Sequence, residues 1–186
     1  MVYNEGMIIL MGLAGSGKST QGKILAEERD GVWLSAGQVL RDTDNEEVHE
    51  VQRRGELVDD RLTIPLMAEA IAAAEQSGKD VILDGYPRTV DQAEWVAGNL
   101  AEQIEAVVRI EVPKSELIQR LKLRGRADDE DESAIEERFR VVEQNIYTVC
   151  EILASKGVSI LRIDGVGTME EITMRLHEVL MTGQSS

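Results

Sequence analysis

The residues with the most specific chemistry lie close to the N-terminus of this 186-residue chain. Residues 12–20 read Gly-Leu-Ala-Gly-Ser-Gly-Lys-Ser-Thr and match the phosphate-loop pattern G-x-x-x-x-G-K-[ST]. Glycines at these places let successive backbone N–H groups curl around phosphate oxygens. Lys18 supplies a point charge for the β and γ phosphates, and Ser19 is placed to hold Mg²⁺. The motif predicts that the chain binds a nucleoside triphosphate together with magnesium.

A second candidate for the magnesium site is an aspartate at the end of an apolar run. Residues 81–84 read Val-Ile-Leu-Asp, and an acidic residue after an apolar strand suits the metal side of a phosphate-loop protein. Many strands end in Asp, so this pattern gains its weight from the phosphate loop. We expect Asp84 to bind the magnesium ion through a bridging water molecule.

Arginine outnumbers lysine, at 14 residues against 6, in a chain whose formal net charge is −15. The overall field should repel nucleic acid and anionic membranes, so we expect neither as a partner. A bound anion must therefore be held by local cations. Arginine suits this work because its planar fork binds phosphate through two parallel hydrogen bonds.

Short apolar runs alternate with longer amphipathic stretches along the chain. The runs predict five buried parallel strands, at 7–11, 32–34, 81–83, 106–112 and 159–163. Helices are predicted at 64–77 with Pro65 in the first turn, at 90–103, at 133–155, and after Thr168, which forms a capping box with Glu171. The alternation indicates an α/β fold with a parallel sheet, helices on both faces, and ligands at the carboxyl edge of the strands.

The single cysteine and the length of the apolar segments indicate the cellular compartment. Cys150 excludes an intramolecular disulfide and a Cys-rich zinc site, and we interpret it as a buried small residue in a helix. No apolar stretch reaches the length of a membrane span. Asn4 and Glu5 precede the first apolar run, where a signal peptide would carry basic residues. We expect a cytoplasmic monomer.

Three classes of phosphate-loop protein compete for this sequence. A GTPase should carry an Asn-Lys-x-Asp guanine reader, and the chain has none. Residues 34–38, Leu-Ser-Ala-Gly-Gln, look like the signature of ABC-type ATPases. That signature sits far downstream in ABC proteins, directly before the second acidic strand, whereas here it follows the phosphate-loop helix. Small-molecule kinases remain.

Several ordered segments resemble the adenylate kinase family of nucleoside monophosphate kinases, in its short-lid form, over nearly the whole chain. The most specific is Asp-Gly-Tyr-Pro-Arg-Thr at 84–89, with Gln92 shortly after it. The other matching segments, besides the phosphate loop with Thr20 and Gln21, are 34–41, 55–60, 120–129 and Arg138.

The resemblance implies the P-loop NTPase three-layer fold, with a five-stranded parallel sheet and helices on both faces. One kinase domain would cover residues 1–186, with a helical acceptor-binding insert at about 35–64 and a very short lid at about 124–133. The implied reaction is reversible, magnesium-dependent transfer of a phosphoryl group from ATP to AMP, which gives two ADP by direct in-line transfer. Mg²⁺ is the implied cofactor.

The resemblance also implies roles for residues that match the family motifs. The ATP site would consist of Gly15, Ser16, Gly17, Lys18, Ser19, Thr20, Arg120, Arg124 and Gly165. The AMP site would consist of Ala36, Arg41, Leu57, Val58, Gly85, Arg88, Gln92, Arg126 and Arg138. The catalytic residues would be Lys18, Arg88, Arg124, Arg126 and Arg138.

A few positions predict which base the acceptor nucleotide carries, and they favour different bases. Gln92 and Thr89 favour AMP, because the related pyrimidine kinases usually carry Asn at both places. Ala36 favours CMP or UMP, because adenylate kinases usually carry Thr there, and Gln38 replaces a residue that is commonly acidic. Gln92 weighs most, because an amide can pair bidentately with an adenine edge. AMP is predicted, with a UMP/CMP-type kinase as the alternative.

The lid departs most from the family pattern. Only Gly125 separates Arg124 from Arg126, so it stays open whether Arg126 reaches the donor phosphates. The acidic run that starts at Asp128 reads equally as a solvated loop and as part of a lid hinge.

Two further functions remain as alternatives. One is a P-loop nucleotide-binding protein without transfer activity, and the arginine cluster argues against it. The other is a kinase for a non-nucleotide substrate, and Gln92 argues against that.

Overall fold

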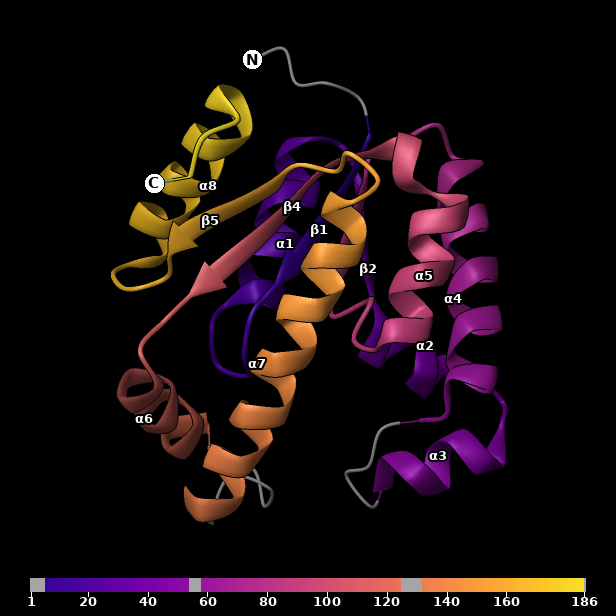
Figure 1. Ribbon diagram of the computed structural model, residues 1–186, viewed down its shortest axis with the longest axis horizontal. Helices are drawn as coiled ribbons and strands as arrows, with labels where there is room; N and C mark the ends of the chain where they lie inside the picture. The colour runs from indigo at the N-terminus through magenta and orange to yellow at the C-terminus, as the bar shows by residue number, and fades with distance from the viewer. Residues whose placement is uncertain (1–5, 54–57, 125–131, 186) are drawn as a thin grey trace.

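One parallel sheet forms the centre of the molecule (Figure 1). The computed structural model describes residues 6–53, 58–124 and 132–185. The five strands lie in the order β2-β3-β1-β4-β5, and every neighbouring pair is parallel. Their bounds are β1 (Met7–Met11), β2 (Val32–Ser35), β3 (Val81–Asp84), β4 (Ile104–Glu111) and β5 (Ile160–Asp164). The predicted fold class is confirmed.

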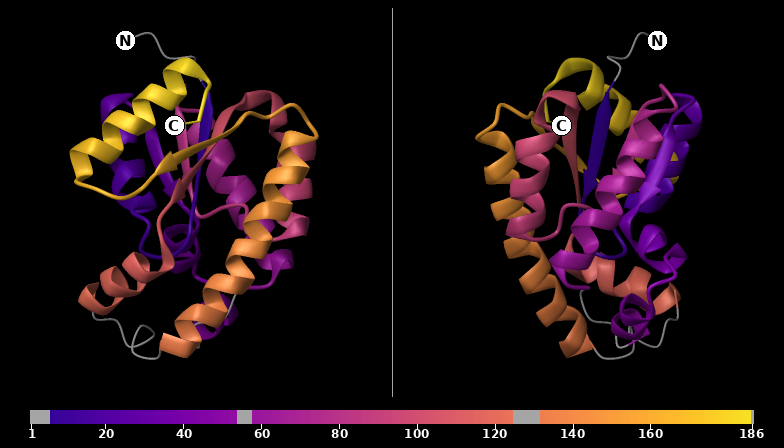
Figure 2. Two further views of the ribbon diagram at one scale, coloured as in Figure 1. Left: turned by 60° about the vertical axis from the view of Figure 1, so that its left-hand side comes forward. Right: turned by 90° about the vertical axis from the view of Figure 1, so that its right-hand side faces the viewer.

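Helices cover both faces of the sheet because β1 is apolar on both sides (Figure 2). Ile8 and Leu10 pack with residues of α1 (Lys18–Glu28) and α8 (Met169–Thr182). Met7, Ile9 and Met11 point to the opposite face and pack with residues of three other helices. These helices are α4 (Asp60–Glu75), α5 (Val90–Asn99) and α7 (Glu132–Ala154). A strand that is buried on both faces reads as a continuous apolar run, which is why this strand could be located from the sequence.

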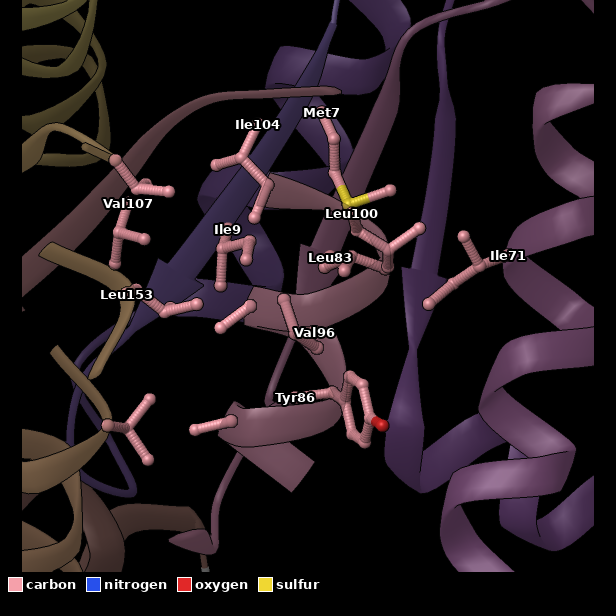
Figure 3. Packing of buried hydrophobic residues seen from close by; sticks show 14 of the residues in the cluster. Met7, Ile9, Ile71, Leu83, Tyr86, Val96, Leu100, Ile104, Val107 and Leu153 are labelled. Carbon is pink, nitrogen blue, oxygen red and sulfur yellow. The ribbon is translucent and has the colours of Figure 1, made fainter. Parts of the chain in front are cut away.

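The larger core cluster lies between the sheet and α4, α5 and α7 (Figure 3). Leu83 from β3, Val96 from α5 and Leu153 from α7 are fully buried there. Tyr86, just beyond β3, is also buried, and burial together with the nearby charge of Asp60 raises the pKa of its phenol. The residues that follow β3 are therefore anchored in the core.

Cys150 lies in this cluster as a buried free thiol in α7, as predicted. Burial raises the pKa of the thiol, and the charges of Arg109 and Arg162 oppose that shift in part. Within the described residues, no helix is long and apolar enough to cross a membrane.

The amino edge of the sheet is held together by Arg29, which directly follows α1. Its side chain is only 1% exposed, and it pairs with Asp80 Oδ2 at 2.6 Å and with Glu105 Oε2 at 2.7 Å. Burial lowers the pKa of Arg29, but hydrogen bonds to Glu105 and Asp80 outweigh this, so the net pKa is raised. The end of α1 is thereby fixed to the residue before β3 and to the second residue of β4.

The carboxyl ends of the strands meet at the opposite edge. β1 is followed there by the phosphate loop and β3 by the segment 85–89. The short helices α2 (Ala36–Asp42), α3 (Glu46–Arg53) and α6 (Lys114–Arg124) lie at this end of the molecule (Figure 1). Because β1 and β3 are neighbours although α1, β2 and three helices separate them in the chain, this edge is the expected ligand site of an open parallel sheet.

Two predicted helix boundaries are wrong. The helix predicted at 64–77 begins at Asp60, because the Asp59 side chain caps it by accepting the Arg61 N–H. Pro65 therefore lies inside α4 rather than in its first turn, and its missing N–H leaves one intrahelical bond unmade. The helix predicted at 90–103 ends at Asn99 and is followed by the short 3₁₀ helix η1 (Ala101–Gln103).

The remaining boundaries lie close to those predicted. The helix predicted at 133–155 is α7, β1 has the predicted bounds, and the ends of the other strands differ by at most two residues. The capping box of Thr168 and Glu171 is present at the start of α8.

Candidate active site

The phosphate loop joins β1 to α1 and closes on itself around one carbonyl. The Leu13 oxygen accepts from Lys18 Nζ at 3.1 Å and from the Ser16 N–H at 3.2 Å. Gly17 caps α1 with φ 93° and ψ 5°, so the helix starts abruptly at Lys18. The positive end of the α1 dipole therefore lies at the loop, as an anion site requires.

The other predicted residues of the loop differ in accessibility. Ser16 is fully buried, backbone included, and its hydroxyl has no hydrogen-bond partner among the described residues. Ser19 and Thr20, in the first turn of α1, are exposed.

Ser19 and Asp84 meet where β1 and β3 end. Ser19 Oγ donates a hydrogen bond of 2.5 Å to Asp84 Oδ2, and Asp84 is 4% exposed. Asp84 pairs with Leu10 in the β1–β3 register, which fixes the carboxylate beside the phosphate loop. Sequence reasoning placed both residues at the magnesium site, and the structure brings them together.

The donor set fits magnesium. A hydroxyl and a carboxylate offer the hard oxygen ligands that Mg²⁺ prefers. The described residues contain no group of three or more His, Cys, Asp or Glu side chains that could hold a metal ion. Mg²⁺ commonly binds through one or two protein oxygens and completes its shell with substrate phosphates and water. Ser19 and Asp84 are sufficient for such a site.

Arg88 lies against Gly85 in the segment that follows β3. Arg88 Nε donates to the Gly85 carbonyl at 2.6 Å. Gly85 has φ 75°, which favours glycine, and a Cβ added there would lie 2.5 Å from Arg88 Nη2, so the arginine side chain would have to move. Burial lowers the pKa of the Arg88 guanidinium, the Asp84 charge opposes the shift, and part of the residue stays open to solvent. The arginine remains a cation that can bind phosphate.

Gln92 is buried at the start of α5 and is held by two neighbours. Its Nε2 donates to Asp60 Oδ1 at 2.6 Å, and its Oε1 accepts from the Arg88 N–H at 2.8 Å. Asp60 Oδ2 also accepts from Thr89 Oγ1 at 2.6 Å, and Thr89 caps α5. Asp60 belongs to a segment that carried the family resemblance, but sequence reasoning gave it no role. Its contact with Gln92 spans 32 positions in the chain, and no local pattern reveals it.

The predicted residues from α2 and its surroundings lie in different environments. Arg41 is exposed on α2, and its Nη2 donates to Gln38 Oε1 at 2.8 Å. Ala36 is buried in the larger core cluster, so its methyl group packs against protein atoms. Val58 packs in a small apolar cluster with residues of α2 and α3. Of these three predicted acceptor residues, Arg41 alone presents a charge at the surface.

Arg120 links the phosphate loop to the loop that follows β5. From α6, its Nη2 donates to the Gly165 carbonyl at 3.1 Å and its Nη1 to the Gly15 carbonyl at 3.5 Å. Its Nε pairs with Glu116 one turn earlier, at 3.0 Å. Three predicted donor-side residues therefore lie together. A Cβ on Gly165 would lie 2.6 Å from methyl groups of β4 and of the residue after it, so glycine is required for this close approach.

Four predicted site residues cannot be placed in this arrangement. Leu57 and Arg126 lie outside the described residues, as do the side chains of Arg124 and Arg138. Their assigned roles stay predictions.

Comparisons with known proteins identify the family of this chain. A model of the adenylate kinase family matches residues 10–158. An adenylate kinase of Thermus thermophilus is 35% identical over 186 residues, which cover 93% of this chain and 96% of the relative. Adenylate kinases of a Synechococcus species and of Micrococcus luteus are 35% and 33% identical, over 93% and 96% of this chain and 97% and 92% of their own lengths. The chain belongs to the adenylate kinase family.

Proposed function

We propose that this protein catalyses reversible, magnesium-dependent transfer of the γ-phosphoryl group of ATP to AMP, giving two ADP. The observation that carries the proposal is the 2.5 Å hydrogen bond from Ser19 Oγ to Asp84 Oδ2. It joins the phosphate loop to Asp84, which directly precedes the segment 85–89 with Arg88, and Gln92 follows in α5. A donor and an acceptor phosphate bound on the two sides of this contact would be neighbours, as direct transfer requires.

On the donor side, Lys18 and the N-terminus of α1 bind the β and γ phosphates of ATP. Ser19 would hold magnesium and Asp84 would do so through water, and the metal would neutralise charge on the phosphates. Arg120 and Gly165 border the nucleoside, because their contact closes the donor side beside the phosphate loop. The other donor residues are Gly15, Ser16, Gly17, Thr20 and Arg124.

On the acceptor side, Arg41 and Arg88 bind the phosphate of AMP and Gln92 reads the base. Arg88 is placed for this role because Gly85 leaves room for its guanidinium beside Asp84. The further acceptor residues are Ala36, Leu57, Val58, Gly85, Arg126 and Arg138.

The chemistry needs no covalent enzyme intermediate. An oxygen of the AMP phosphate attacks the γ phosphorus as the bond to the β-bridging oxygen breaks, so ADP forms on both sides of the transfer. The residues orient the two nucleotides and neutralise their charge. We expect the insert at about 35–64 and the short lid at about 124–133 to exclude water, so that ATP hydrolysis without acceptor is slow, although residues 54–57 of the insert and 125–131 of the lid lie outside the described residues. The proposal includes a cytoplasmic monomer.

The acceptor is tested by supplying ATP and Mg²⁺ with AMP, CMP, UMP or GMP in turn and measuring kcat/KM for diphosphate formation. We expect AMP to be the best acceptor, and Arg88→Ala to lose roughly 10³-fold or more. A preference for CMP or UMP would keep phosphoryl transfer but reverse the base assignment. Absence of transfer to every monophosphate would contradict the proposal.

A further inference from the structure

The side-chain amide of Gln92 can adopt only one of its two orientations. Its Nε2 faces Asp60 Oδ1 at 2.6 Å, and its Oε1 faces the Arg88 N–H at 2.8 Å. A carboxylate only accepts hydrogen bonds and a backbone N–H only donates them. Rotating the amide by half a turn would set oxygen against oxygen and N–H against N–H. The chemistry of the two partners thus fixes the orientation.

Asp60 is itself held in place. Its second carboxylate oxygen accepts from Thr89 Oγ1 at 2.6 Å, so both oxygens bind the start of α5. Asp60 stands in the first turn of α4, one residue after the Asp59 cap. The carboxylate therefore connects α4 to the start of α5. It cannot turn away without breaking both of these hydrogen bonds.

The fixed amide leaves a defined pattern for a ligand. Beyond its bonds to described residues, Nε2 has one more N–H and Oε1 one more lone pair. Adenine presents an amino N–H beside a ring nitrogen acceptor, which matches this pair of groups. A 6-oxopurine presents an acceptor oxygen where adenine presents the amino group. It would meet Gln92 Oε1 with a second acceptor unless the amide reversed.

We propose that Asp60 is a positioning residue that makes the acceptor site select 6-amino over 6-oxo purine nucleotides, because it prevents reversal of the Gln92 amide. The inference rests on the proposed function, in which Gln92 reads the acceptor base. Cytosine shares the amino and ring-nitrogen pattern of adenine, and uracil shares the oxo pattern. Asp60 thus separates amino bases from oxo bases, and other groups must separate AMP from CMP.

The experiment compares AMP with inosine monophosphate (IMP), which differs from AMP only by an oxygen in place of the 6-amino group. kcat/KM for both is measured in the wild type, in Asp60→Asn and in Asp59→Asn. An Asn at position 60 can donate to a reversed Gln92, so that only the Arg88 N–H would still oppose reversal, and we expect the AMP-to-IMP ratio to fall by about tenfold. Asp59→Asn should keep the wild-type ratio, because the side chain of Asp59 binds only Arg61 among described residues and Asn also caps helices.

The selectivity ratio separates this role from a structural one. If Asp60 only stabilised the fold, Asp60→Asn would lower the rates with AMP and IMP in proportion, and an unchanged ratio would overturn the inference. Asp60→Ser serves as a second variant if circular dichroism shows Asp60→Asn to be unfolded. A wild type that fails to phosphorylate AMP would contradict the proposed function instead. Calorimetric binding of AMP and IMP to the same variants would then still test Asp60, with the same change in ratio expected.

Discussion

At the scale of single residues, the position of Arg88 depends on its contact with Gly85. The backbone of Gly85 has φ 75°, and the Arg88 guanidinium occupies the space where a Cβ would lie. The positive φ favours glycine at this position, and any added side chain would displace Arg88. Arg88 is the residue that we propose to bind the acceptor phosphate.

Gly85→Ala should displace Arg88 and weaken the acceptor phosphate site. We expect KM for AMP to rise by about tenfold, with a fall in kcat, because a shift of about 1 Å near the reacting groups can cost 10²-fold. Steady-state kinetics with varied AMP at saturating ATP measures this. Gly98→Ala in α5 is the control, since no atom lies within 4 Å of its added Cβ. Wild-type kinetics in Gly85→Ala would refute the role assigned to this contact.

Residue types and spacing predicted part of the site at this scale. Lys18, Ser19 and Asp84 were predicted because each belongs to a local motif, and the structure brings them to one edge of the sheet. Asp60 was missed because its importance lies in a contact with Gln92 across two helices. Likewise, nothing in the sequence indicated that Ala36 would be buried in the core.

At the scale of elements, the strands were predicted more reliably than the helix ends. Strands buried on both faces produce short apolar runs that stand out from their surroundings. Helix ends depend on single capping residues, and Pro65 was mistaken for a first-turn residue while Asp59 was the actual cap. The strand order β2-β3-β1-β4-β5 could not be derived from the sequence. It depends on the side of the existing strands on which each connection places the next strand, and no local pattern records this.

The Arg29 ion pairs join α1 to the starts of β3 and β4, and their removal should destabilise the fold. Arg29→Met leaves the carboxylates of Asp80 and Glu105 without their partner, and breaking a buried pair costs about 3–5 kcal/mol. Urea unfolding would report this as a lower unfolding free energy. Lys79→Met is the matched control, because its pair with Asp30 is exposed and worth about 0–1 kcal/mol. An equal fall in the unfolding free energy of both variants would show that the buried ion pairs of Arg29 contribute no more than the exposed pair of Lys79.

At the scale of the whole molecule, a chain with net charge −15 has to bind two polyanions. The fold supports this by placing the positive end of α1 and the side chains of Lys18 and Arg88 at one edge of the sheet. The α/β alternation predicts parallel strands, and the carboxyl ends of parallel strands share one edge of the sheet. The location of the site could therefore be predicted from the sequence. The neighbouring positions of β1 and β3 make this edge suited to transfer between two nucleotides.

The most direct test of the account is the stoichiometry of the reaction. ATP, AMP, ADP and free phosphate would be quantified by chromatography and a phosphate assay, with Mg²⁺ present and with AMP supplied or omitted. Direct transfer predicts two ADP for each AMP consumed, and only slow phosphate release when AMP is omitted. Phosphate release as fast as ADP formation, or ADP formation without consumption of AMP, would contradict it.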